Sequence, residues 1–360
     1  TGGTSTYTYL WTPSNGGLIP AGMQTAANLS GVRAGTYSVK ILDANGCEKI
    51  ETYELRQPAP VAISEVVPNR RNILCYGEAT GNITVLGSGG IKQYTFTVTG
   101  TDYTGTAVSL TSGPTNLNLF SFSALKAGTY VLTLTDLNGC QKSVAPITLT
   151  QPLAPLQISN QVLSNYNGFN IACFGDTNGS ISHQVSGGTA PYRYAWTGPN
   201  GFTSTNEDLS ALVAGTYQVT VRDANACTPL VGPQITITQP TQLALTNSQV
   251  NNACFQGNAG SIYITASGGT APYTYAWTVS DGGQIPTGMQ TAANLTGIKK
   301  GSYTVKVTDS NGCEKSETFV ITEPAQVAIS EVVANRRNIL CFGEATGTIS
   351  VEGTGGTKQY

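Results

Sequence analysis

The sequence has few charged residues and a single histidine, and both shortages limit what it can do. Charged residues make up 11% of the chain, against roughly 25% in an average soluble protein. Lysine and arginine are scattered, and the pairs Arg70-Arg71 and Arg336-Arg337 are expected to be solvated loop charges. Nucleic-acid binding is therefore not expected. The lone His183 provides neither a catalytic triad nor a zinc site.

Other signals of chemistry are also missing from the sequence. No run approaches the roughly 18 apolar residues that a membrane span needs, and no Cys-x-x-Cys occurs. The Gly-Gly pairs are not followed by a helix pattern or by Lys-Ser/Thr, so they are not phosphate-binding loops. We expect no catalytic residues, no cofactor and no metal ligands, and hence no enzyme.

The residues that are abundant favour strands and turns. The chain contains 42 glycines and is rich in Thr, Ser and Asn, while strong helix formers are sparse. A length of 360 residues suits three or four small domains better than one. An all-β fold is the expectation.

Cysteines mark a repeat of roughly 80–100 residues, the size of an immunoglobulin-like sandwich. Each unit has one cysteine near its start and a second within Asp-x-Asn-x-Cys. The first cysteines are Cys75, Cys173, Cys254 and Cys341, and the second are Cys47, Cys140, Cys227 and Cys313.

A longer repeat spans three such units. Residues 1–94 align without a gap on 267–360, with 63 identical positions. This similarity indicates a duplicated three-domain block in a longer parent protein. We expect both ends of the sequence to fall inside domains, with any targeting signal outside it.

Gln-Pro or Glu-Pro pairs separate the units and predict short, stiff linkers. They lie at 57–58, 151–152, 239–240 and 323–324. Complete immunoglobulin-like repeats are therefore predicted at 59–152, 153–240 and 241–324. Residues 1–58 form the C-terminal part of a repeat, and 325–360 form the N-terminal part of another.

Apolar residues alternate within each repeat, as a two-layer sandwich requires. In 241–324 the pattern predicts Leu243 and Leu245 in a first strand, with four more strands after it. Their apolar positions are Ile262, Ile264 and Ala266; Tyr273, Tyr275 and Trp277; Tyr303, Val305 and Val307; and Phe319 and Ile321. The fold class expected is a row of immunoglobulin-like or PKD-like β-sandwiches arranged end to end.

The last hairpin of each repeat carries an Asp-x-Asn turn, followed by glycine as at 309–312 except in 223–226, where alanine takes its place. An Asn-Gly turn calls for positive φ at both residues. Oxygen ligation of Ca²⁺ is an alternative use of these turns, but one turn has too few carboxylates, so we expect turn chemistry alone. A sugar-stacking platform is one possible role for Trp11, Trp196 and Trp277. Each tryptophan shares one face of a predicted strand with other aromatic residues, and this instead favours core packing.

Cysteines at regular repeat positions predict disulfides, but the sequence leaves three connectivities open. Pairing within a repeat gives 75–140, 173–227 and 254–313. Pairing across each linker gives 47–75, 140–173, 227–254 and 313–341. The favoured pattern joins consecutive repeats, Cys75 with Cys227 and Cys173 with Cys313. It is favoured because a strand of about 20 Å separates the two cysteines of one repeat, too far for a disulfide.

Several motifs together resemble the SprB-type repeat of giant surface adhesins from gliding Bacteroidetes. Cys-Phe-Gly-x-x-x-Gly-x-Ile occurs at 173–181 and 341–349, and Gly-Gly-Thr-Ala-Pro-Tyr-x-Tyr-Ala-Trp at 187–196 and 268–277. Ala-Gly-Thr-Tyr-x-Val-x-Val-x-Asp-x-Asn-x-Cys follows at 214–227. Gln256 replaces the expected glycine, and 59–152 lacks the Trp and the Ala-Pro-Tyr. The resemblance implies type IX export, display on the cell surface, and a role in gliding or attachment.

These observations favour a structural rod segment of an extracellular adhesin or filament. The partners expected are neighbouring repeats of the same chain, with laterally associated copies as a further class. One alternative is that the repeats themselves bind glycans or solid surfaces, for which Tyr103 and Phe120 in the long insert of 59–152 are the exposed candidates. Another alternative is a spacer in a secreted multidomain hydrolase.

Overall fold

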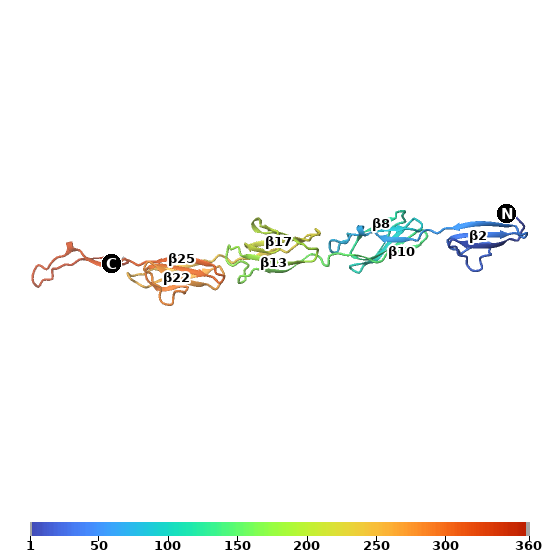
Figure 1. Cartoon of the computed structure of the whole chain (residues 1–360). Coiled ribbons are helices and arrows are strands. Elements are labelled where there is room, and N and C mark those ends of the chain that lie inside the picture. Colours follow the sequence, from blue (N-terminus) through green and yellow to red (C-terminus); the bar gives the residue numbers. More distant parts are fainter. Residues whose placement is uncertain (1, 358–360) are drawn as a thin grey trace. The chain divides into compact units, whose positions relative to one another are not determined.

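The computed structural model describes residues 2–357, and its regular secondary structure consists almost entirely of strands (Figure 1). The chain divides into two compact units, Thr1–Leu153 and Ala154–Tyr360, each of which is described by itself. Helical segments in residues 2–357 are three-residue 3-10 turns, too short to cross a bilayer: η1 (Val67–Asn69), η2 (Pro199–Gly201) and η3 (Val333–Asn335). The all-β prediction is confirmed.

The first unit begins with one antiparallel sheet of order β1-β2-β3. Tyr37 and Val39 are buried on β2, whereas every residue of β3 is exposed. The strands of this sheet are β1 (Thr8–Ser14), β2 (Gly35–Leu42) and β3 (Glu48–Leu55).

Two sheets enclose an apolar core in the rest of the first unit. Phe96 and Ile83, one from each sheet, are fully buried in this core. One sheet has the order β4-β5-β8: β4 (Ala62–Glu65), β5 (Gly81–Ser88) and β8 (Leu119–Leu125). The other has the order β10-β9-β6-β7, with β11 also on β9: β6 (Thr95–Asp102), β7 (Ala107–Thr111), β9 (Gly128–Thr135), β10 (Gln141–Ser143) and β11 (Ile147–Leu149).

The second unit contains two sandwiches of the same design. In the first, β12-β13-β16 faces β15-β14-β17-β18, with β19 also on β17, and Ile181 and Trp196 from opposite sheets share the core. Its strands are β12 (Gln157–Leu163), β13 (Gly179–Ser186), β14 (Arg193–Thr197), β15 (Thr203–Ser204), β16 (Leu209–Leu212), β17 (Gly215–Arg222), β18 (Leu230–Val231) and β19 (Ile235–Ile237).

In the second sandwich, β20-β21-β23 faces β22-β24-β25, and a hairpin of β26 and β27 follows. Ile262 and Trp277 come from opposite sheets and share one core. The strands are β20 (Ala244–Val250), β21 (Gly260–Ser267), β22 (Thr274–Ser280), β23 (Leu295–Ile298), β24 (Gly301–Thr308), β25 (Glu314–Ile321), β26 (Ala328–Glu331) and β27 (Val351–Thr354).

Alternating burial on the strands confirms the period-two reading of the sequence. Along β24, Tyr303, Val305 and Val307 are fully buried, while the residues between them are more exposed. Trp277 pairs with Val305 across β22 and β24 and is 5% exposed. The prediction that Trp196 and Trp277 pack in cores is confirmed, whereas Trp11 is only partly buried.

The Gly-Gly pairs end the second strand of each sandwich because no larger residue fits there. Gly268 has φ of +71°, and a Cβ atom on it would lie 2.1 Å from the carbonyl oxygen of Gln242. Gly187 repeats this arrangement against Pro155, at 1.8 Å. A backbone that turns this close to the preceding strand requires glycine.

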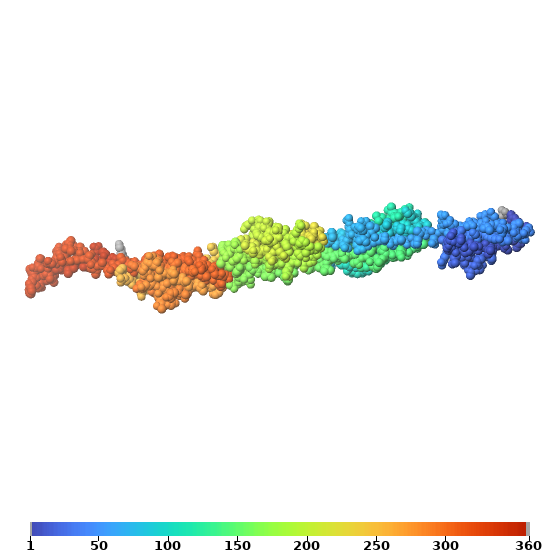
Figure 2. Space-filling model, in the orientation of Figure 1, coloured from blue at the N-terminus to red at the C-terminus, as the bar shows by residue number. Residues whose placement is uncertain are grey.

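Each of the three apolar cores lies inside one of the repeats predicted at 59–152, 153–240 and 241–324. Figure 2 shows, within the second unit, the green-to-yellow atoms of repeat 153–240 against the orange atoms of repeat 241–324. The domain boundaries at the proline pairs remain predictions.

Candidate functional site

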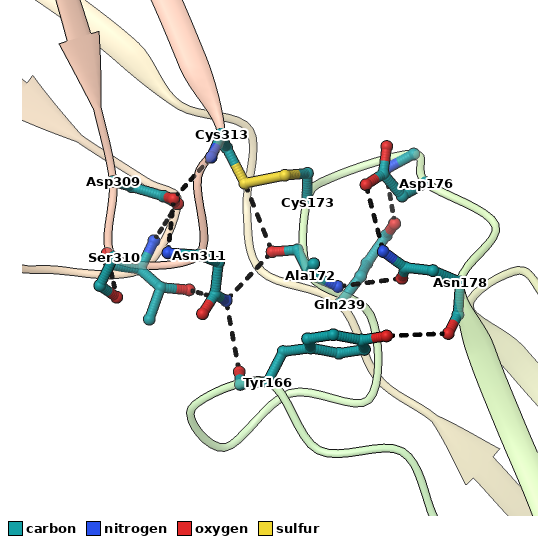
Figure 3. Close-up of a disulfide and its surroundings, with 12 residues drawn as sticks. Tyr166, Ala172, Cys173, Asp176, Asn178, Gln239, Asp309, Ser310, Asn311 and Cys313 are labelled. Atoms are coloured by element: carbon teal, nitrogen blue, oxygen red, sulfur yellow. Dashed lines mark hydrogen bonds between the residues drawn. A yellow bond between two sulfur atoms is a disulfide. The ribbon is translucent and has the colours of Figure 1, made fainter.

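The turn 309–313, between β24 and β25, is built around the buried carboxylate of Asp309 (Figure 3). One oxygen accepts hydrogen bonds from the backbone N–H groups of Asn311 and Cys313, both at 2.9 Å. The other oxygen accepts the N–H of Thr270, at 2.8 Å, just after the Gly-Gly pair. This carboxylate therefore ties the last hairpin to the loop before β22.

The same carboxylate contact recurs in the other repeats. The N–H of the second cysteine donates to this aspartate in each case, and a residue just after the strand-ending glycines donates to its other oxygen. The aspartates and their donors are Asp43 with Cys47 and Thr4, Asp136 with Cys140 and Ile91, and Asp223 with Cys227 and Thr189. Backbone donors lower the pKa of Asp43 and Asp136, those of Thr4 and Ile91 having the largest effect.

One detail of the turn prediction was wrong. Gly312 takes a φ of +87°, but Asn311 does not have positive φ. The N–H of Gly312 donates to the carbonyl of Asp309 at 3.1 Å, and the N–H of Asp309 donates to the carbonyl of Cys313 at 3.0 Å. Three residues thus lie between the ends of this hairpin, and only the last of them needs a left-handed conformation.

A disulfide joins Cys173 to Cys313, with 5.7 Å between the Cα atoms (Figure 3). Cys173 precedes β13 in repeat 153–240, and Cys313 ends the turn before β25 in repeat 241–324. The bridge therefore links consecutive repeats inside the second unit. It is one of the two pairs that the favoured sequence pattern names.

Hydrogen bonds from Asn311 run beside this disulfide (Figure 3). Its side-chain amide nitrogen lies 3.1 Å from the carbonyl oxygen of Ala172 and 3.3 Å from that of Tyr166, both in the other repeat. The amide of Asn167 donates back to the side-chain oxygen of Asn311, at 2.6 Å. We call the loop 164–170, Ala172, the turn 309–313 and the disulfide the joint.

The loop 164–170 is held in shape by its own hydrogen bonds. Tyr166 and Phe169 exchange backbone hydrogen bonds around the pair Asn167-Gly168, where both residues have positive φ. Ser164 and Asn170 close the base of the loop, because the hydroxyl of Ser164 donates to the carbonyl of Asn170 at 2.7 Å. The two-residue Asn-Gly turn thus occurs here rather than at 311–312.

In three of the four linkers, the residue before the proline holds the loop that carries the first cysteine of its repeat. The side chain of Gln239 accepts the N–H of Gly175 at 2.8 Å, and Gln151 accepts the N–H of Gly77 at the same distance. Glu323 accepts the N–H of Gln256 at 2.7 Å. The sequence analysis missed this contact, although Gln or Glu before every linker proline was a visible signal.

Comparison with known proteins identifies the repeat. The sequence profile of the SprB repeat matches residues 169–201 and 246–282. These two stretches of the chain are SprB repeats. Each matched stretch contains a first cysteine, Cys173 or Cys254, whereas the turn 309–313 lies outside both.

A decoration protein of Escherichia phage T5 is 44% identical to this chain over 66 residues, 18% of the chain. The matched part spans 40% of that protein's length. Three N-terminal domains of the bacteriophage RB49 Hoc capsid protein share 13% identity, with a TM-score of 0.32 over 72% of this chain and 96% of theirs. A tetra-tandem repeat from the extending region of a large adhesion protein shares 17% identity, with a TM-score of 0.29 over 88% and 91%. Such TM-scores support no argument about this chain.

The other cysteines of the chain have different surroundings. Cys47, Cys140, Cys254 and Cys341 are free and exposed. Cys75 and Cys227 lie in different units, so their pairing remains a prediction.

The two aromatic residues proposed for surface contacts also differ from each other. Tyr103 is 39% exposed, and its ring lies 5.6 Å from that of Tyr76. Phe120 is only partly exposed, because it stacks on Phe96 at 5.4 Å and packs against the core. The prediction that Phe120 is a good exposed residue was wrong, because Phe120 lies on β8, opposite Val85 of β5, and its ring packs against the core.

His183 lies on β13, where its side chain is 6% exposed. Its ring packs edge-on against Tyr194 at 5.7 Å and Trp196 at 5.5 Å. Neither ring nitrogen has a hydrogen-bond partner, and burial lowers the pKa of this imidazole. Among residues 2–357, no group of three or more His, Cys, Asp or Glu side chains is placed to hold a metal ion.

Proposed function

We propose that this SprB repeat region is a load-bearing structural segment of a long surface adhesin or filament. The Cys173–Cys313 bridge carries the proposal, because it joins consecutive repeats covalently. Such bridges persist in oxidising compartments, in agreement with an extracellular position. Export by the type IX system of Bacteroidetes and a role in attachment or gliding follow from the family resemblance and belong to the same proposal. We assign the chain no catalytic role.

The position of the disulfide determines which strands carry tension. Force that enters repeat 153–240 passes along β12 to Cys173, crosses the sulfur–sulfur bond to Cys313, and leaves along β25. With this bridge alone, the strands from β13 to β24 lie outside the covalent path. Pulling on the chain ends therefore does not load them, and most of both sandwiches stays folded under tension.

Force spectroscopy on the whole chain tests this proposal directly. The bridge spans a sequence separation of 140, and an extended chain reaches about 3.3–3.6 Å per residue. Full extension of the oxidised chain should therefore fall short of that of the reduced chain by about 480 Å. If Cys173–Cys313 is the only bridge, the Cys173→Ser/Cys313→Ser variant should lose this shortfall without any reductant. Equal extension of the oxidised and reduced wild-type chains would remove the basis of the proposal.

The same measurement tests the predicted Cys75–Cys227 bridge. With both bridges, the covalent path between Cys75 and Cys313 retains only residues 173–227. The shortfall then grows to about 630 Å. A value near 480 Å would show that this second bridge is absent and would leave the proposed load path through Cys173 and Cys313 in place.

A direct surface-binding role for the repeats has Tyr103 as its remaining candidate, since it forms a partly exposed ring pair with Tyr76. Exposed aromatic side chains are common contact points in binding surfaces. A glycan array probed with the whole chain and with the Tyr103→Ser variant tests this role. Binding that Tyr103→Ser does not weaken would rule out this site.

A further inference from the structure

We infer that Asn311 and the loop 164–170 form a recognition contact that docks one repeat on the next before the disulfide closes. This contact selects which cysteines pair, and the partner that it fits is an Asp-x-Asn-x-Cys turn of a following SprB repeat. The inference concerns the same joint as the proposed function, but it is about assembly and not about load.

The chemistry of the contact suits a primary carboxamide. The carbonyl oxygens of Tyr166 and Ala172 accept from the Asn311 amide, while the Asn167 amide donates to its oxygen. Asparagine presents both a donor and an acceptor in this way. Aspartate cannot donate to the two carbonyls, so its carboxylate oxygen would repel theirs. Alanine would leave the two carbonyls and the Asn167 amide without this hydrogen-bond partner.

Both sides of the contact are shaped by interactions within their own repeats. On one side, the hydrogen bonds between Tyr166 and Phe169 fix the tip of the loop. On the other side, Asp309 binds the backbone of the turn, and the hydroxyl oxygen of Thr270 lies 3.1 Å from the Asn311 amide nitrogen. Preorganised partners lose less conformational entropy on docking. Docking can therefore place the two thiols together before oxidation.

Sequence differences between the repeats make the loop the selective element. All four Asp-x-Asn-x-Cys turns carry asparagine at this position: Asn45, Asn138, Asn225 and Asn311. The acceptor loops are not alike, since residues 164–172 separate β12 from Cys173, whereas only 251–253 separate β20 from Cys254. Repeat 241–324 therefore has no counterpart of Asn167. The loop, and not the turn, therefore distinguishes repeat 153–240 from repeat 241–324.

The experiment uses the whole chain at redox equilibrium in glutathione buffer. Mapping of non-reduced peptides measures the fraction of Cys173–Cys313 bridge, and hence the effective concentration of one thiol at the other. Asn167→Gly removes the amide but keeps the left-handed backbone of residue 167, which has φ of +51°. We expect this change and Asn311→Ala each to lower the effective concentration about five- to tenfold. Asn311→Asp should lower it further.

Asn138→Ala is the matched control, because it changes the same turn position in the first unit. It should leave the Cys173–Cys313 equilibrium unchanged. Asn311→Ala also loses a contact inside its own repeat, so Asn167→Gly, on the opposite side of the joint, decides the question. A wild-type effective concentration in Asn167→Gly, within twofold, would overturn the inference. The load-bearing proposal would survive that result, because the bridge would still form.

Discussion

The side-chain amide of Asn311 donates a hydrogen bond to the carbonyl oxygen of Ala172, 3.1 Å away in the preceding repeat. Ala172 directly precedes Cys173, and Asn311 lies two residues before Cys313. The hydrogen bond and the disulfide therefore join the same two short segments side by side. A noncovalent contact at this position holds the geometry that the covalent bond requires.

The number of free thiols tests the connectivity of the whole chain. Bridges at Cys173–Cys313 and Cys75–Cys227 leave four of the eight cysteines reduced. We expect a thiol reagent to titrate four groups in the native chain, without denaturant. Six groups would mean that the second bridge is absent. None would mean pairing across every linker, and two would mean pairing within repeats.

The acid sensitivity of repeat 153–240 should depend on His183. Burial lowers the pKa of this imidazole, and the nearby Asp208 and Glu207 only partly oppose that effect. The unfolded chain, with a histidine pKa of about 6.5, then takes up a proton more readily than the folded repeat. The contribution of His183 to the free energy of unfolding should be fully present above pH 6.5 and should be lost as the pH drops through the folded-state pKa. Amide protection factors in β13 and β17 between pH 7.5 and 5, which correct for the intrinsic pH dependence of exchange, measure this loss.

Repeat 241–324 suggests the matched variant for that measurement. Ile264 occupies the position equivalent to His183 and is 5% exposed. His183→Ile should therefore remove most of the pH dependence while keeping the core filled. The protection factors of amides in repeat 241–324 should not change over the same pH range. An equal loss of protection in His183→Ile at pH 5 would show that another group is responsible.

The turn 223–227 should gain stability from a glycine. Ala226 adopts a φ of +55°, where the equivalent turn residue in repeat 241–324 is Gly312. A left-handed conformation costs a residue with a side chain roughly 1–2 kcal/mol, part of which the greater freedom of glycine in the unfolded chain offsets. Ala226→Gly should stabilise the local hairpin by about 1 kcal/mol, measured by hydrogen exchange of β17 and β18.

Gly312→Ala is the converse change and should destabilise its own hairpin by a similar amount. Its effect should appear in β24 and β25 and not in repeat 153–240. Slower exchange after Gly312→Ala would show that backbone strain does not control these turns.

Gln239 should stabilise the loop that carries Cys173. Its side-chain oxygen accepts the N–H of Gly175 at 2.8 Å, and one such hydrogen bond contributes about 1 kcal/mol. Gln239→Ala should therefore speed exchange of the Gly175 amide about fivefold. Gln239→Glu should keep the bond, because Glu323 makes the equivalent contact with Gln256. Equal exchange rates in the three proteins would contradict this role.

Much of the fold could be predicted from the sequence because burial leaves a periodic trace. The alternation of Tyr303, Val305 and Val307 predicts a strand with one buried face, and the structure buries all three. Phe120 shows the limit of this reasoning. Phe120 lies on β8 opposite Val85 of β5 and stacks on Phe96, and the local pattern does not encode this strand pairing.

The sequence by itself determined the strands, the turns and the repeat period, since each depends on residues close together in the chain. Only the tertiary structure decided what the joint is made of. The groups that accept Asn311 are the backbone carbonyls of Tyr166 and Ala172. Every residue has such a carbonyl, so no side-chain pattern marks these two. Their role arises because folding brings a turn more than a hundred residues away against them.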